Sequence, residues 1–409
     1  MTYRQSYSTE KIKEKALLIG VHTQSSEFNF ESTMSELEAL SDTCGLEVKG
    51  TLSQNLKDMH PKHYMGKGKL QEVQDAVYFH DIDVIVTNDE LSTAQSKHLN
   101  DILGIKIIDR TQLILEIFAM RAQSKEGKLQ VEYAQLDYLL PRLMGHGKSL
   151  SRLGGGIGTR GPGETKLETD RRHIRTRMNE IKRKLKEVEI HRERYRQQRE
   201  QNEVFQIALV GYTNAGKSSW FNVLTEDETY EKNQLFATLD PKTRQITIND
   251  GFQLVISDTV GFIQKLPTTL IDAFKSTLVE AKQADLLIHV VDASHKEAKI
   301  QYETVLQLIK DLNMDHIPQV VLFNKKDLMH EAPPISPHAS LSVSSKDEQD
   351  QKRVRQLLFE QLKKQLTHYE TSLEVAKADQ LFTLKRHTLV TSIDFNETDE
   401  TYHIQGYRK

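Results

Sequence analysis

Residues 211–219 read Gly211-Tyr-Thr-Asn-Ala-Gly-Lys-Ser-Ser219, and they follow directly on the short apolar run Ile207-Ala-Leu-Val210. The spacing G-x-x-x-x-G-K-[ST] between a strand and a helix is typical of a phosphate-binding loop, whose backbone N–H groups point at an anion. We expect a helix to begin at Lys217, whose ammonium group would reach the β- and γ-phosphates, and the Ser218 hydroxyl to ligate Mg²⁺. This stretch predicts an α/β domain that binds a nucleotide.

The composition limits the classes of protein to which the chain can belong. With 409 residues it is too long for one typical core, and its net charge of −3 gives no overall nucleic-acid or membrane signal. Cys44 is the only cysteine, so no internal disulfide can form, and no apolar run approaches the ~20 residues of a membrane-spanning helix. The first residues lack the apolar core of a signal peptide. We expect a monomeric, cytoplasmic protein without stable membrane insertion.

The apolar pattern divides the chain into four parts. Residues 1–126 are expected to form a small N-terminal α/β domain, and residues 127–202 a long antiparallel helical hairpin with a Gly-rich loop. Residues 203–366 are expected to form the nucleotide-binding domain around a doubly wound sheet. Residues 367–409 are expected to form a small α+β C-terminal appendage.

In the N-terminal part, apolar runs alternate with helical patterns. We expect buried strands at residues 16–21 and 82–87, and helices near residues 31–43, 68–79 and 93–103. This alternation favours a parallel sheet.

Two short patterns in the same part have competing interpretations. Gly66-Lys-Gly-Lys69 precedes a helix and is either a second anion site or a basic helix start; its spacing is not that of a phosphate loop, which favours the helix start. His60 and His63 lack a third ligand nearby, so we predict no metal site there.

The second arm of the hairpin is strongly basic. Residues 166–199 hold 13 Lys or Arg against six Asp or Glu, a local balance of +7, and Pro141 is expected to bend or end the first arm. The residues alone leave two interpretations open, a solvated coiled-coil flank and an RNA-backbone contact. The Gly-rich linker 152–164 is longer than a helix–helix turn needs, which favours a contact loop. The candidate RNA contacts are Arg152, Arg160, Lys166, Arg171, Arg172 and Arg175.

Two segments that follow the phosphate loop suit a nucleotide switch. Phe236-Ala-Thr-Leu-Asp240 offers Thr238 as a mobile threonine that closes on Mg²⁺ and the γ-phosphate. Asp258-Thr-Val-Gly261 ends a predicted strand, so its carboxylate would lie near Mg²⁺ and the Gly261 amide would sense the γ-phosphate.

Two later segments select the base. Asn324-Lys-Lys-Asp327 follows a predicted strand, and a buried Asp327 carboxylate would accept hydrogen bonds from N1–H and the 2-amino group of guanine. Adenine lacks both donors and would leave the carboxylate unpaired. In Ser344-Ser-Lys346 a backbone amide would cap guanine O6. The segments in this order predict a GTP-binding switch.

The expected nucleotide-binding residues are Gly211, Tyr212, Thr213, Asn214, Ala215, Gly216, Lys217, Ser218, Ser219, Phe236, Ala237, Thr238, Leu239, Asp240, Asp258, Thr259, Val260, Gly261, Asn324, Lys325, Lys326, Asp327, Ser344, Ser345 and Lys346. We assign catalytic roles to Asn214, Lys217, Thr238 and Gly261, and Mg²⁺ coordination to Ser218, Thr238 and Asp258.

The residue after Gly261 bears on catalysis. Ras-like proteins carry a water-orienting glutamine there, whereas this chain has Phe262 followed by Ile263, and neither side chain can orient water. Intrinsic hydrolysis is therefore slow, or water is held by the backbone, a cation or a partner. Asn214 either ligates K⁺ beside the phosphates in place of an arginine finger or only supports the loop geometry.

The chain resembles the HflX family of bacterial GTPases, apart from Ser345 and Trp220, which stand where the family has other residues. The resemblance implies a GTP hydrolase that binds the large ribosomal subunit and rRNA, splits stalled or hibernating ribosomes, and is stimulated by the ribosome. It also implies ATP binding by the N-terminal domain. The stretches that carry it are Gly66–Lys69, Asp89–Ser92, Ile108–Thr111, Glu132–Leu136, Ser151–Arg172, Gly211–Ser219, Phe236–Arg244 and Asp258–Ile263.

Two other functions fit the same residues. One is a regulatory GTPase that acts on a protein partner through the coiled-coil hairpin. The other is an N-terminal ATP-dependent RNA-remodelling enzyme with GTP as regulator.

Overall fold

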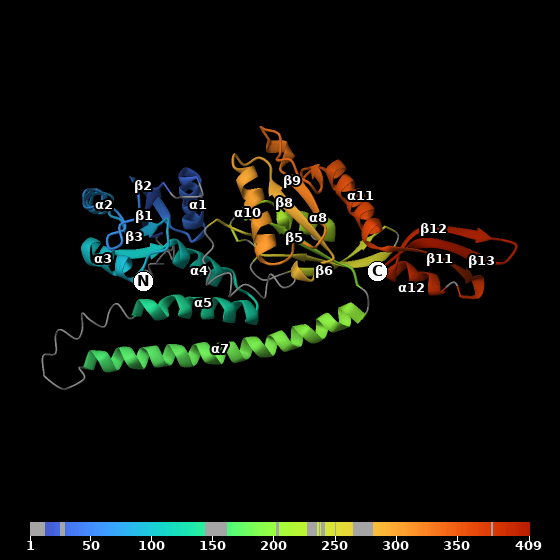
Figure 1. The fold of residues 1–409 in the computed structure, drawn as a ribbon, viewed down its shortest axis with the longest axis horizontal. Coiled ribbons are helices and arrows are strands. Elements are labelled where there is room, and N and C mark those ends of the chain that lie inside the picture. The colour runs from blue at the N-terminus through green and yellow to red at the C-terminus, as the bar shows by residue number, and fades with distance from the viewer. Residues whose placement is uncertain are drawn as a thin grey trace, which may run out of the picture. The chain divides into compact units, whose positions relative to one another are not determined.

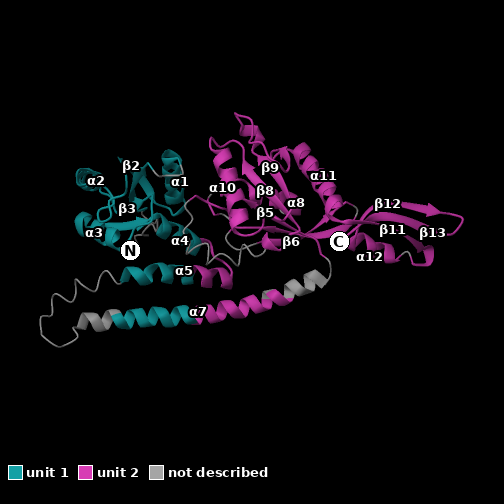
Figure 2. Cartoon of the chain, viewed as in Figure 1, with its two compact units in different colours: residues 1–120, 132–179 teal, residues 121–131, 180–409 magenta. Residues whose placement is uncertain are grey.

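The computed structural model forms two compact units (Figures 1 and 2), residues 1–120 with 132–179 and residues 121–131 with 180–409. The predicted sites Arg152, Arg160, Ala237, Leu239 and Asp240 lie outside the described residues. The structure describes residues 13–24, 29–143, 162–201, 204–226, 235–236, 238, 242–249, 251–264, 281–377 and 379–409.

The first unit contains a four-stranded parallel sheet of order β2-β1-β3-β4. Its central strand β1 is apolar and almost wholly buried, as the sequence predicts, whereas the unpredicted β2 alternates exposed and half-buried residues and carries little apolar signal. The strands are β1 Lys15–Thr23, β2 Glu47–Leu56, β3 Val84–Thr87 and β4 Lys106–Asp109.

Two helices of this unit, α1 and α3, begin at side-chain caps. The Asn29 side chain accepts hydrogen bonds from the backbone of Glu31 and Ser32, and Ser92 forms a reciprocal capping box with Gln95. The three predicted helices are confirmed and a fourth follows β4. They are α1 Phe30–Thr43, α2 Lys67–His80, α3 Thr93–Leu103 and α4 Arg110–Arg121.

Two long helices form the hairpin, α5 (Lys125–Leu143) and α7 (Pro162–Gln201). Pro141 lies in the last turn of α5, which confirms that the first arm ends near it. The 40 residues of α7 span about 60 Å at ~1.5 Å per residue. Within the first unit the arms run side by side (Figure 1), and Arg177 of α7 donates two hydrogen bonds, of 2.6 and 2.9 Å, to the Glu132 carboxylate of α5.

The second unit contains a six-stranded sheet of order β10-β9-β8-β5-β7-β6 (Figure 1). Among its described strands β6 alone is antiparallel to its neighbour, because it pairs with β7 as the hairpin that Asn249-Asp-Gly251 predicts. The apolar strands β5, β8 and β9 are buried almost throughout. The strands are β5 Gln206–Gly211, β6 Lys242–Ile248, β7 Phe252–Asp258, β8 Leu286–Asp292, β9 Gln319–Asn324 and β10 Ala339–Ser342.

Helices connect these strands, and a smaller antiparallel sheet of order β11-β13-β12 follows them. The sequence predicts the strands near residues 387–395 and 401–407, but β11 and α12 are not predicted because their residues are largely polar. The elements are α8 Lys217–Thr225, α10 Ala298–Asp311, the 3-10 turn η2 Lys326–Leu328, α11 Glu348–Gln365, β11 Thr367–Glu374, the 3-10 turn η3 Val375–Lys377, α12 Asp379–His387, β12 Leu389–Asn396 and β13 Thr401–Arg408. Across the described residues, no helix combines the length and apolarity needed to span a membrane.

One buried histidine makes the second unit sensitive to acid. His289 of β8 is 1% exposed, stacks on Tyr302 at 5.1 Å, and has no hydrogen-bond partner for either ring nitrogen among the described residues. Burial lowers its pKa from 6.5 to about 3. Below pH 6.5 the imidazole of His289 is protonated in the unfolded chain but stays neutral in the folded chain. The free energy of unfolding therefore decreases as the pH falls from 6.5 towards 3.

We expect this loss to reach about 1.4 kcal/mol per pH unit at most. His289→Phe retains the stacking and should flatten the dependence, measured as urea unfolding by circular dichroism at pH 7 and pH 5. His316→Gln, at an exposed position, is the control and should leave the dependence unchanged. An equal loss in His289→Phe and the unaltered chain would contradict the assignment.

Candidate nucleotide-binding site

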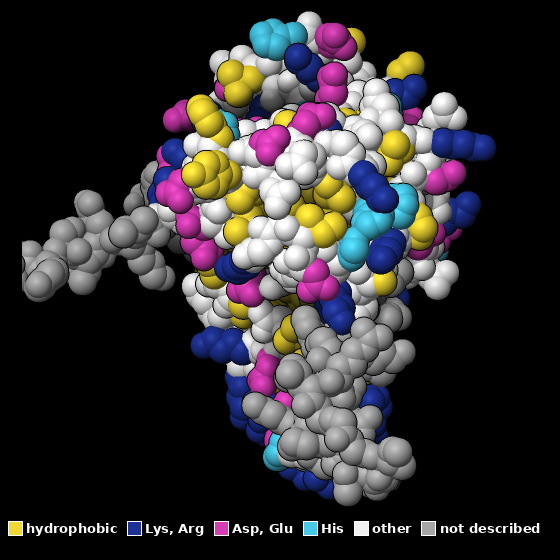
Figure 3. All heavy atoms as spheres, turned by 90° about the vertical axis from the view of Figure 1, so that its left-hand side faces the viewer, with side chains coloured by type: hydrophobic (Ala, Val, Ile, Leu, Met, Phe, Trp, Pro, Cys, Tyr) yellow, Lys and Arg dark blue, Asp and Glu magenta, His cyan; other side chains and the backbone are white. Residues whose placement is uncertain are grey.

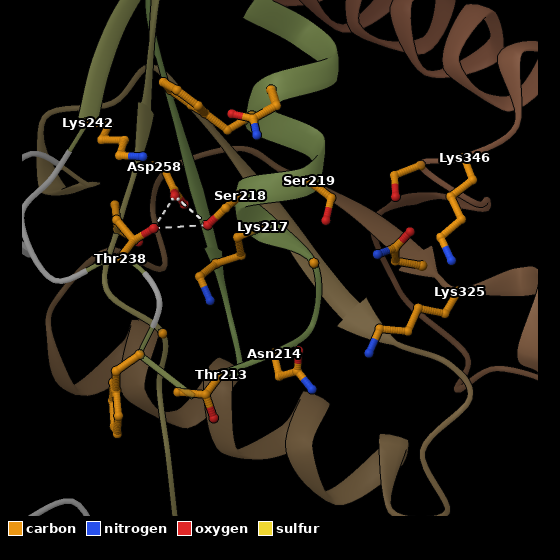
Figure 4. Close-up of a pocket in the computed structure, with 18 of the residues that line it drawn as sticks. Thr213, Asn214, Lys217, Ser218, Ser219, Thr238, Lys242, Asp258, Lys325 and Lys346 are labelled. Carbon is orange, nitrogen blue, oxygen red and sulfur yellow. Dashed lines mark hydrogen bonds between the residues drawn. The ribbon is translucent and has the colours of Figure 1, made fainter. Parts of the chain in front are cut away.

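A cavity of about 610 Å³ opens beside the carboxyl ends of the parallel strands of the six-stranded sheet. Side chains from all five predicted segments line it (Figure 4). They meet because parallel strands of one sheet deliver the loops that follow them to the same edge. Within the predicted segments the cavity therefore unites residues up to 133 positions apart in the sequence, from Thr213 to Lys346.

The loop after β5 has the backbone of a phosphate cradle. Gly216 has φ +97°, and a Cβ atom there would lie 2.1 Å from Asn324 Nδ2, so only glycine fits. Lys217 opens α8, is 6% exposed, and donates to the carbonyl oxygens of Tyr212 (2.8 Å) and Gly211 (3.2 Å). Burial lowers the pKa of Lys217 to about 8. An anion in the cradle would supply the charge that this buried ammonium group lacks.

Three oxygen-bearing side chains converge beside Lys217 (Figure 4). Ser218 Oγ lies 2.9 Å from Thr238 Oγ1, and both hydroxyls donate to Asp258 Oδ2 at 2.8 Å. Burial raises the pKa of Asp258, and its buried Oδ1 has no hydrogen-bond partner among the described residues.

This oxygen set fits a magnesium ion. Neighbouring ligands of an octahedral Mg²⁺ lie about 3 Å apart, because each stands ~2.1 Å from the ion. The separation of the Ser218 and Thr238 hydroxyls matches that spacing. The unsatisfied oxygen of Asp258 is available for a bound cation or its water.

The segment after β7 is fastened to the phosphate loop by its backbone. The Thr213 amide donates to the Phe262 carbonyl at 2.7 Å, and the Phe262 amide donates to the Gly211 carbonyl at 3.1 Å. Phe262 is 3% exposed, so its side chain presents no polar group to an attacking water. Gly261 allows the approach, since a Cβ atom there would lie 2.9 Å from Lys217 Nζ. Asn214, with φ +59°, is exposed at the rim.

The base-selecting segment leaves β9 at the far side of the cavity. Asn324 is buried, and Lys325 donates to Asp292 at 2.6 Å, which fixes the start of the loop. A buried Asp327 is expected from the sequence, whereas Asp327 is exposed and lines the cavity. The expectation of burial is wrong because Asp327 lies in the short 3-10 turn η2, none of whose residues is buried.

The segment after β10 contains three backbone amides that could donate a hydrogen bond to guanine O6, and two of them already have acceptors. The Ser344 amide donates to Asp350 at 2.9 Å, and the Lys346 amide donates to Ser344 Oγ at 3.4 Å. The Ser345 amide is thus the remaining candidate of the three.

Lys242 is a cavity residue that no motif in the sequence predicts. It opens β6, lines the cavity, and lies beside Asp258 in Figure 4. Its pairing opposite Asp258 in the β6–β7 ladder causes this placement. No spacing in the sequence marks it, because register across a hairpin decides which lysine faces the site.

The described RNA-contact candidates Arg171, Arg172 and Arg175 are not among the residues that line this cavity. On α7, Arg172 and Arg175 are exposed, whereas Arg171 lies 3.7 Å from Glu168. In Figure 3, Lys and Arg side chains gather at the lower end of the view, where the first part of α7 lies. Lys166 is within α7, but the structure does not describe its side chain.

The structure describes both of the short N-terminal patterns. Gly66 caps α2 without a side-chain hydrogen bond, and Lys69 pairs with Glu72 at 2.7 Å, which suits a basic helix start. His63 lies between His60 and His98, with ring centroids 4.6 and 4.2 Å away. Within the described parts of the chain, no group of three metal-ligating side chains has a geometry that would hold a metal ion.

Three family models match consecutive parts of the chain between residues 31 and 325. Residues 31–119 match the family model described as GTP-binding GTPase N-terminal, and residues 121–199 match GTP-binding GTPase Middle Region. Residues 206–325 match the model described as 50S ribosome-binding GTPase.

The chain is similar to several GTPases over most of its length. The chain is 47% identical over 395 residues to the GTPase HflX of Alkalihalophilus pseudofirmus, covering 96% of this chain and 93% of that one. It is 43% identical over 322 residues to the GTPase HflX of Escherichia coli, covering 78% and 75%. A crystal structure of a GTP-binding protein from Sulfolobus solfataricus with GDP is 24% identical, with a TM-score of 0.45, over 85% of this chain and 98% of that chain.

Proposed function

Because the chain belongs to the HflX family of GTPases, we propose that it is a ribosome-associated enzyme that binds the large subunit and splits stalled or hibernating ribosomes. The chain hydrolyses GTP to GDP and phosphate. One observation supports the assignment of that reaction to the cavity above: five sequence segments meet there with the Ser218–Thr238–Asp258 oxygens at metal-ligand spacing.

In this proposal one end of the cavity binds the phosphates and the other end binds the guanine base. Lys217 and the loop amides hold the β- and γ-phosphates, while Asp327 and the Ser345 amide select guanine. Ser218, Thr238 and Asp258 would hold Mg²⁺, which neutralises charge that develops on the phosphates. Thr238 belongs to the segment that would respond to loss of the γ-phosphate.

Two observations support a ribosomal partner. Residues 206–325 match a family described as 50S ribosome-binding GTPase. The long helix α7 exposes Arg172 and Arg175 on a segment of net charge +7, which suits the phosphate backbone of rRNA.

We expect the chain to co-sediment with purified large subunits in a non-hydrolysable GTP analogue, and binding to weaken as salt is raised. Arg172→Glu with Arg175→Glu should lower the affinity about 10-fold or more and reduce the salt slope by about two, because two phosphate contacts are lost. Sedimentation at several salt concentrations measures both effects.

The matched control is Lys310→Glu with Lys364→Glu, which reverses the same amount of charge at exposed positions of α10 and α11. It should bind as the unaltered chain does. Binding that ignores the α7 reversal, together with nucleotide-dependent capture of a single protein, would instead indicate a regulatory switch with a protein partner.

We further propose that K⁺ assists hydrolysis through Asn214. Phe262 offers no group to orient water, whereas the exposed amide of Asn214 borders the phosphate cradle. Replacing Na⁺ by K⁺ should raise the GTPase rate at least about 10-fold, as expected for one stabilising group at the transition state. Asn214→Ala should remove the difference between the ions and leave GDP affinity within twofold. Equal GTPase rates of the unaltered chain in Na⁺ and in K⁺ would contradict this proposal.

A further inference from the structure

The only tryptophan of the chain lies between the phosphate loop and the base-selecting loop. Trp220 is in the first turn of α8, is fully buried, and donates its indole N–H to Asn324 Oδ1 at 3.0 Å. These two residues are 104 positions apart in the sequence. The ordinary requirements of a phosphate loop do not call for a side-chain donor at this position.

Asn324 is held from two sides. Its Oδ1 accepts from Trp220, and its Nδ2 donates to the Ala215 carbonyl of the phosphate loop at 2.9 Å. The indole N–H can only donate and the carbonyl can only accept. The amide therefore has one satisfied orientation, because a flip would oppose two donors at one end and two acceptors at the other.

This arrangement fixes the first residue of the base-selecting segment against the phosphate cradle. Asn324 is 2% exposed, and its Nδ2 occupies the space that a Cβ atom on Gly216 would fill. Nδ2 carries two hydrogens, and the Ala215 carbonyl uses one. The other remains for an acceptor on the purine, such as N7.

We propose that Trp220 is a positioning residue for guanine-nucleotide binding, which acts by holding the Asn324 carboxamide in its binding orientation. The proposal rests on the nucleotide site proposed above. Without the indole donor, the buried Asn324 oxygen has no partner at that end, and the amide samples orientations that do not serve the nucleotide.

The test removes the indole N–H and little else. Trp220→Phe, and the unaltered sequence with its single tryptophan replaced by 3-benzothienylalanine, which has sulfur in place of N–H, should both bind GDP about 10-fold more weakly. The kcat of each at saturating GTP should stay within twofold, because Trp220 touches no reacting group. Leu224→Ala truncates another buried side chain of α8 and is the control; it should lower thermal stability and leave GDP affinity unchanged.

A double-mutant cycle separates positioning from general packing. In an Asn324→Ala background, Trp220→Phe should weaken GDP binding no further, because its acceptor is gone. Losses that multiply, or a benzothienylalanine protein that binds GDP as tightly as the unaltered one, would overturn the proposal. Failure of the unaltered chain itself to bind GDP would instead refute the assigned nucleotide site.

Discussion

Replacing Asp327 by asparagine is expected to lower the affinity for GTP at least about 100-fold and to raise the affinity for XTP. Guanine presents two donors, N1–H and the 2-amino group, and a carboxylate accepts from both. An asparagine amide would set a donor against one of these donors. Xanthine has a carbonyl at C2 in place of the amino group, so it matches the amide. Competition of GTP and XTP for the GDP-loaded protein measures the change in their relative affinities.

Asp315→Asn, at an exposed position in the same unit, is the control and should leave the preference for GTP intact. The exposure of Asp327 makes the variant a clean one, since no described residue depends on its carboxylate for folding. An Asp327→Asn protein that still prefers GTP would mean that another group reads the base.

Lys217→Ala is expected to reduce GTP hydrolysis by about 10³-fold, comparable to the loss of a strong preorganised donor. The ammonium group is buried at the head of α8, where desolvation lowers its pKa, so an added negative charge would favour its protonated form. Bound phosphates would supply that charge, and the lysine would stabilise what develops on them during transfer. Single-turnover hydrolysis with excess protein separates this effect from weaker binding.

The control is Lys299→Ala, because Lys299 is a well-exposed lysine of α10 and should be dispensable. ATP turnover is measured in the same preparations. ATP hydrolysis that survives Lys217→Ala while GTP hydrolysis disappears would place a second nucleotide-hydrolysing site in the N-terminal part. Unchanged GTP hydrolysis would contradict the role of the phosphate loop.

The nucleotide-binding domain is the part that the sequence predicted best. The apolar runs that became β5, β8 and β9 are buried on both faces, so their sequences are continuous and unambiguous. Because such strands end at one edge, the motifs that follow them were expected to meet, and they line one cavity. β2 was missed because one of its faces stays in contact with water, which leaves polar residues at alternate positions.

Contacts between distant side chains could not be predicted in the same way. The approach of Lys242 to the site depends on hairpin register, and the hydrogen bond from Trp220 to Asn324 depends on where α8 places the indole relative to the end of β9. The sequence marked Trp220 only as a departure from the family. The exposure of Asp327 depends on the local backbone of η2, which the motif does not encode.

A single indole in a chain of 409 residues also has an optical consequence. Light absorbed at the red edge of the aromatic band excites Trp220 alone, and this ring contacts Asn324 and lies two residues after Ser218 in α8. The tryptophan fluorescence of the native chain therefore reports on a single location, the junction between α8 and the end of β9. In the proposed site this junction lies between the phosphate-binding loop and the base-selecting segment. Occupancy of that junction can be followed without a label.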